Sequence, residues 1–181
     1  LVGALSGVMK AEAPADATTW RVILEPKYLR AAVSQSIPGA NRTELAAAVS
    51  QEDTTKTLAK AEFEKLGVDW EAFTAKAAEN AAADLAGLTP RFERNRKKVI
   101  EFAELQSDRP IVASAVLSTK LVEKFKDTLG ERLLVIVPNR FRAFVFPKLA
   151  STHREYAPMV FEAYRATAHP VSLEVFEVSA E

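Results

Sequence analysis

The chain has 181 residues, of which 48% are hydrophobic and 27% charged. These proportions are typical of a globular domain and exclude the polar, highly charged composition of disordered chains. The 24 basic and 24 acidic residues cancel, so attraction to nucleic acid or to an anionic membrane has to come from a local patch. The absence of cysteine excludes disulfides, cysteine nucleophiles and thiolate metal sites. We expect a single domain over residues 1–181.

The beginning of the chain leaves two localisations open. No apolar run in the sequence is long enough to cross a bilayer, so we predict no membrane span and a cytoplasmic location. Residues 1–9 are apolar and small, however, and Ala11-Glu12-Ala13 follows them. Export after removal of a signal peptide therefore stays an alternative.

Residues 1–90 are predicted to be mainly helical. The alanine-rich sequence after residue 27 favours helices at 28–34, 43–50, 57–66 and 69–85, because alanine is the strongest helix former. Gly67 has the position of a helix C-cap and Asp69 that of the next N-cap. These caps predict a corner between two helices at which Phe63 and Phe73 meet.

Residues 91–181 show short β-branched and aromatic runs separated by helical patterns. The pattern predicts strands at 98–105, 132–138, 141–146 and 171–178, and helices at 110–129 and 154–168. A hairpin turn is expected at Pro138-Asn139-Arg140. The order is β-α-β-β-α-β, as in the ferredoxin-like, split β-α-β motif. We therefore predict an α+β fold in which a helical N-terminal part precedes a ferredoxin-like sheet layer.

Motifs for catalysis, metals and cofactors are absent from the sequence. The two imidazoles, His153 and His169, lie in no nucleophile or zinc motif, and the six glycines form no phosphate-binding loop. We predict no catalytic residue, no metal site and no cofactor.

A local concentration of positive charge lies at residues 91–98, with five cations and one acid. A basic flank on a β-α-β-β-α-β domain is typical of RNA-recognition modules, which stack bases on exposed strand aromatics. That function would require Phe102, Phe144 and Phe146 to share an open sheet face. The third strand lacks the glycine and the paired aromatic register of that signature, so RNA binding is an alternative that the sequence does not favour.

Several segments resemble the bacterial YtpQ-like family, a domain of unknown function. The resemblance covers residues 57–178 and depends on the segment 57–85, Ala113-Ser114-Ala115-Val116-Leu117, LLVIVPNRFRAFVF and PVSLEVFEV. It implies a bacterial, intracellular α+β protein and carries over no site residue.

The function favoured by the sequence is a non-catalytic binding or protein-interaction domain, with another protein as one candidate partner and the oligomeric state open. The polar surface near the Asn139-Arg140 turn is the expected contact site. The alternative is an enzyme for a small anionic substrate, with Arg140, Arg142 and Arg154 as anion clamps. The enzyme requires these arginines to converge in one pocket.

Overall fold

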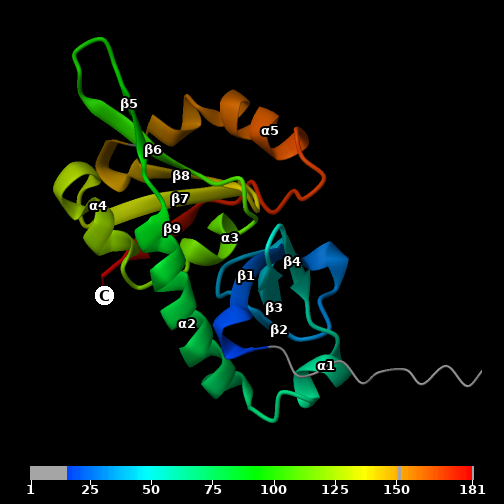
Figure 1. Ribbon diagram of the computed structural model, residues 1–181. Coiled ribbons are helices and arrows are strands. Elements are labelled where there is room, and N and C mark those ends of the chain that lie inside the picture. The colour runs from blue at the N-terminus through cyan, green and yellow to red at the C-terminus, as the bar shows by residue number, and fades with distance from the viewer. Residues whose placement is uncertain (1–15, 151, 181) are drawn as a thin grey trace, which may run out of the picture.

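Two antiparallel sheets and the helices between them form the structure, a computed structural model that describes residues 16–150 and 152–180 (Figure 1). The expected α+β class is confirmed. Residues 1–13, on which the alternative of a removed signal peptide depends, lie outside the described residues. None of the helices in the described part of the chain is long and apolar enough to cross a membrane.

The N-terminal sheet, called sheet A, lies within residues 20–57, where two of the four helices predicted for residues 1–90 were expected. Its strands are β1 (Trp20–Pro26), β2 (Ser34–Ser36), β3 (Thr43–Gln51) and β4 (Thr54–Thr57), and β3 pairs with all three others. Short 3-10 turns η1 (Ala17–Thr19) and η2 (Lys27–Leu29) flank β1. The predicted helices at 28–34 and 43–50 are therefore wrong.

Burial explains why the alanine-rich segment is a strand. Ala46 and Ala48 pack with Ile23 in one buried cluster, whereas Ala47 belongs to another cluster with Phe73. The three alanines are completely buried, so packing on both faces of β3 outweighs the helix preference of alanine, which amounts to only a few tenths of a kcal/mol per residue.

The predicted corner between two helices is confirmed. Helix α1 (Lys60–Glu64) ends before Gly67, which has a positive φ of 68°. Asp69 then caps α2 (Trp70–Gly87) by accepting a hydrogen bond from the Ala72 N–H at 2.8 Å. Phe63 and Phe73 meet with ring centroids 5.2 Å apart. Helix α2 packs on β1 and carries its apolar residues toward both halves of the chain.

The second sheet, called sheet B, has the strand order β5-β6-β8-β7-β9. Its strands are β5 (Arg91–Arg94), β6 (Ile100–Gln106), β7 (Arg132–Asn139), β8 (Arg142–Pro147) and β9 (Phe176–Ser179). The helices are α3 (Val112–Ala115), α4 (Leu121–Leu129) and α5 (Ala157–Arg165), with 3-10 turns η3 (Lys148–Ala150) and η4 (Thr152–Arg154) before α5. The predicted helix at 110–129 is thus two helices.

Sheet B keeps only the first part of the predicted ferredoxin-like order. Strand β8 lies between β6 and β7, as in a split β-α-β unit, but β9 pairs with β7 instead of β6. Strand β5, which the sequence did not predict, already covers the free edge of β6. The segment between α5 and β9 therefore runs along β7 instead. Its Val171 N–H donates to the Pro138 carbonyl at 2.9 Å.

One core cluster joins the two sheets. Leu24 of β1 and Leu85 of α2 are buried in the same cluster as Phe125 of α4 and Val135 of β7. Most of the cluster comes from α3, α4 and the inner face of sheet B. The two sheets lie side by side around this cluster. Polar side chains meet where the sheets adjoin, at a junction that includes Glu25 of β1 and Arg140 in the turn after β7.

Candidate functional site

Two of the four predicted site residues lie at this junction. Asn139 is buried and donates through its side-chain amide to the Ala163 carbonyl at 2.8 Å. The Arg140 guanidinium contacts both carboxylate oxygens of Glu25 at 2.9 Å and donates to the Thr55 carbonyl at 2.5 Å. Both side chains thus hold β7 and β8 to neighbouring elements.

The other two predicted residues lie elsewhere. Arg142 pairs at 3.0 Å with the buried carboxylate of Glu104, which also pairs with Arg91. Arg154 is exposed in η4, and no residue in the described ranges pairs with it. The structure therefore does not bring Arg140, Arg142 and Arg154 together into one pocket.

The aromatic residues predicted for RNA stacking are buried. Phe102, Phe144 and Phe146 are at most 3% exposed, and they pack with Val160 and Ala163 of α5. Helix α5 and not the N-terminal segment covers this face of the sheet. The three side chains are therefore inaccessible to bases.

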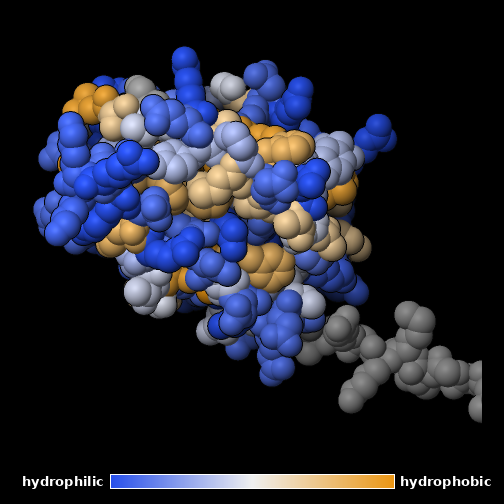
Figure 2. Space-filling view, turned by 90° about the horizontal axis from the view of Figure 1, so that it is seen from above, coloured by the Kyte–Doolittle hydropathy of each residue, from blue (hydrophilic) through white to orange (hydrophobic). Residues whose placement is uncertain are grey.

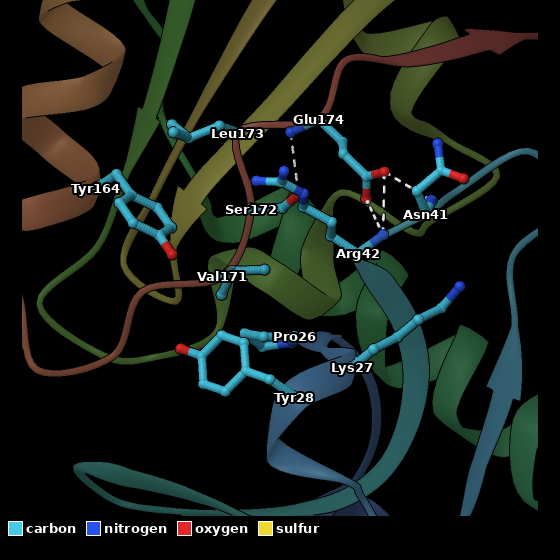
Figure 3. Close-up of a pocket in the computed structure, with 10 residues that line it drawn as sticks. All are labelled: Pro26, Lys27, Tyr28, Asn41, Arg42, Tyr164, Val171, Ser172, Leu173 and Glu174. Carbon is cyan, nitrogen blue, oxygen red and sulfur yellow. Dashed lines mark hydrogen bonds between the residues drawn. The ribbon is translucent and has the colours of Figure 1, made fainter.

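A pocket of about 640 Å³ lies at the junction, close to Glu25 but outside the predicted set. One wall comes from the end of β1, η2 and the two residues before β3, and the other from α5 and the chain leading to β9 (Figure 3). Its volume falls within the range of small-molecule sites. The lining residues are Pro26, Lys27, Tyr28, Asn41, Arg42, Tyr164, Val171, Ser172, Leu173 and Glu174.

The carboxylate of Glu174 fixes one side of the pocket. It accepts hydrogen bonds from the Asn41 N–H at 2.7 Å, the Arg42 N–H at 3.2 Å and the Thr43 hydroxyl at 2.5 Å. Thr43 also contacts the Ser172 hydroxyl at 2.7 Å. Burial disfavours the charged carboxylate, but these donors outweigh burial and hold the pKa of Glu174 below its ordinary value.

Two tyrosines form the aromatic part of the pocket. Tyr28 comes from η2 and Tyr164 from α5, and Figure 3 shows them on either side of Val171. Tyr28 is 64% exposed. Its pKa is raised by partial burial and by the neighbouring Tyr164 and Glu25. Neither phenol has a hydrogen-bond partner among the described residues.

Two cations complete the lining. Lys27 uses one of its three N–H donors on the Ala40 carbonyl at 2.7 Å, which leaves two donors. The Arg42 guanidinium has no partner in the described part of the chain. With Glu174 saturated by donors, the free hydrogen-bonding groups of the pocket are mostly cationic or phenolic.

Sequence reasoning missed this pocket because its residues come from four separate segments. The sequence around Asn41-Arg42-Thr43 was interpreted as the start of a helix, and Tyr28 as a helical residue. Residues 171–174 belong to the segment PVSLEVFEV that carries the YtpQ-like resemblance, but the resemblance assigns them no role. No motif connects these positions, so no local signal was available to find the site.

No group of His, Cys, Asp and Glu side chains within the described ranges is arranged to hold a metal ion. No protein family model, curated protein or solved structure matches the chain. The YtpQ-like resemblance thus stays a prediction, and the site has to be interpreted from its own geometry.

Proposed function

We propose that this chain is a non-catalytic binding domain whose junction pocket takes a small organic anion with an aromatic or other flat apolar part. The observation that carries the proposal is the pairing of Tyr28 and Tyr164 with the two cations Lys27 and Arg42 around one pocket of about 640 Å³. Ligand sites typically combine an apolar wall with a few directed polar groups.

Charge supports an anionic ligand. Lys27, Arg42 and Glu174 are the ionisable groups of the pocket wall other than the tyrosines. The carboxylate of Glu174 is already bound by two backbone N–H groups and the Thr43 hydroxyl. A ligand anion would therefore meet the guanidinium of Arg42, whose planar donors suit carboxylates and phosphates.

Shape supports an apolar ring. Tyr28, Tyr164, Val171 and Leu173 provide aromatic and aliphatic surface, and Leu173 is 43% exposed. Covering this surface would stabilise the complex through the hydrophobic effect. The phenol groups would add hydrogen bonds at the edge of a bound ring.

The enzyme alternative receives less support, because the arginines that it required lie in separate places. A protein partner, a cytoplasmic location and bacterial origin remain predictions of the sequence and of the resemblance. None of them conflicts with a pocket for a small anion.

The experiment is ligand titration of the ¹⁵N-labelled chain with phenyl phosphate and benzoate, and with benzyl alcohol as the neutral probe. We expect the anions to shift backbone resonances near residues 27–28, 41–42 and 171–174, and benzyl alcohol to bind at least about tenfold more weakly. Arg42→Gln should abolish this preference for anions, whereas Arg154→Gln, which removes an exposed arginine elsewhere, should not.

Two outcomes would contradict the proposal. Equal binding of benzyl alcohol and phenyl phosphate would show that Lys27 and Arg42 do not select the ligand. Resonance shifts confined to residues outside the pocket would show that the anion binds elsewhere.

A further inference from the structure

The β5–β6 hairpin projects from the end of sheet B (Figure 1), and hydrogen bonds close the turn at its tip. The Asn95 N–H donates to the Val99 carbonyl at 2.9 Å, and the Lys98 N–H donates to the Asn95 carbonyl at 2.8 Å. The Asn95 side-chain oxygen also accepts from the N–H groups of Lys97 and Val99. The tip therefore presents its side chains in a defined arrangement.

Three consecutive cations form this tip. Arg96, Lys97 and Lys98 are exposed, and none of them pairs with an acidic residue in the described part of the chain. The exposed Arg94 adds a fourth cation and braces the turn by donating to the Lys98 carbonyl at 2.9 Å. In Figure 2 hydrophilic residues gather on the side where Figure 1 shows the hairpin.

Lys98 has a backbone conformation that glycine would adopt more easily. Its φ is 63°, in the left-handed region, which costs a residue with a side chain about 1 kcal/mol. Strained residues of this kind cluster at functional sites. At this position the lysine adds a third positive charge to the tip.

Apolar side chains are exposed at the same end of the molecule. Val99, beside the tip, is 58% exposed, and Leu149 in η3 is 98% exposed. Because β8 is antiparallel to β6, its last residues lie beside the first residues of β6. The Thr152 hydroxyl, just after η3, donates to the Glu101 carbonyl at 3.5 Å. Leu149 therefore lies near the base of the hairpin.

We propose that this end of the molecule docks on an anionic lipid bilayer. The cations of the tip would contact lipid phosphates and carboxylates, while Val99 and Leu149 would enter the interface between headgroups and acyl chains. The chain as a whole has no net charge, so this local patch supplies the attraction. The proposal is independent of the ligand pocket.

A bilayer fits the patch better than nucleic acid does. Single-stranded nucleic acids are bound by cations together with exposed aromatic side chains on which bases stack. The exposed apolar residues here are aliphatic, and the nearby Phe102 and Phe146 are buried. A protruding tip of cations beside aliphatic side chains suits a bilayer surface, where anionic headgroups lie above apolar acyl chains.

Vesicle co-sedimentation of the full chain tests the proposal. We expect binding to phosphatidylcholine vesicles that contain phosphatidylserine, no binding to pure phosphatidylcholine, and loss of binding at high salt. The variant Arg96→Ser/Lys97→Ser/Lys98→Gly should weaken binding at least about tenfold. The control Lys60→Gln/Lys65→Gln/Lys76→Gln removes the same number of charges at α1 and in the N-terminal half of α2, which lie far from the hairpin in Figure 1, and should bind as the parent chain does.

Single variants separate docking from folding. Lys98→Gly should leave the melting temperature unchanged or raise it, because glycine adopts the positive φ without strain, and should still reduce vesicle binding. Val99→Ser/Leu149→Ser should weaken binding at constant charge.

The proposal is wrong if phosphatidylserine vesicles do not bind at low salt, or if the tip and control triple variants bind equally. It is also wrong if a labelled RNA or duplex DNA oligonucleotide binds through the tip while vesicles do not. That last result would identify the tip as a nucleic-acid surface.

Discussion

Two carboxylates cross the junction between the sheets, and their surroundings shift their pKa values in opposite directions. Glu25 extends from β1 to the Arg140 guanidinium, and burial raises its pKa despite that partner. Glu174 reaches the start of β3, and its hydrogen-bond donors lower its pKa despite burial. Glu25 is only 3% exposed and is bound by one cation, whereas three separate donors bind Glu174.

The contrast follows first from burial, because Glu25 is almost completely buried whereas Glu174 is only half-buried, so that less dehydration cost opposes the donors of Glu174. Removing a carboxylate and a guanidinium from water costs several kcal/mol each, and their attraction has to repay both costs. Backbone N–H groups that are already oriented by a loop are dehydrated at a much smaller cost. The two residues thus offer a paired test of these principles within one junction.

The largest effect is expected from Arg140→Ala. The substitution leaves Glu25 buried without its partner and should lower the free energy of unfolding by about 3–5 kcal/mol. The double replacement Glu25→Leu/Arg140→Met should cost clearly less, because it removes both charges together. Urea unfolding of the parent and the two variants measures this. A loss below about 1 kcal/mol for Arg140→Ala would show that Glu25 is hydrated after the change.

Glu174→Gln should have an intermediate effect, a loss of about 1–2 kcal/mol, because a neutral amide oxygen accepts these hydrogen bonds more weakly than a carboxylate does. Glu155→Gln, at an exposed position, is the matched control and should change little. Equal stabilities of the two variants in urea unfolding would mean that the Glu174 contacts to residues 41–43 are not formed in solution.

The dependence of stability on pH sharpens the comparison. The depressed pKa of Glu174 stabilises the folded chain above the ordinary value of 4.5, and this contribution is lost as the pH falls through the folded-state pKa. The difference between the parent and Glu174→Gln should therefore shrink as the pH falls below about 4.5. The raised pKa of Glu25 acts in the opposite sense, since its contribution is lost as the pH rises above 4.5. Urea unfolding of the parent and Glu174→Gln over this pH range measures both contributions. If the loss of unfolding free energy in Glu174→Gln grew as the pH fell, the lowered pKa of Glu174 would be contradicted.

The smallest effect is expected from an ion pair on the surface. Lys76 and Glu79 lie one turn apart on α2, 2.6 Å from each other, and both side chains are exposed. Lys76→Ala should change the free energy of unfolding by at most about 0.5 kcal/mol, because water screens the pair and alanine favours the helix. The same urea experiment gives the value. If Lys76→Ala lowered the free energy of unfolding as much as Arg140→Ala does, burial would not explain the different strengths of the two ion pairs.

The sequence predicted the elements whose signals are local. Gly67, with its positive φ of 68°, follows the first helix of the corner and Asp69 caps the second, as the sequence indicated. The two central strands β7 and β8 also lie where their apolar runs indicated. In each case a few neighbouring residues restrict the backbone strongly enough to specify the structure.

Tertiary structure decided sheet A, the order of sheet B and the pocket. The alanines of β3 prefer a helix by only small free energies, and burial on both faces outweighs that preference. Strand β9 lies beside β7 because β5 occupies the other edge. The pocket joins η2, the two residues before β3, α5 and residues 171–174. Contacts between such distant segments depend on how the whole chain packs, and no local pattern of residues encodes them.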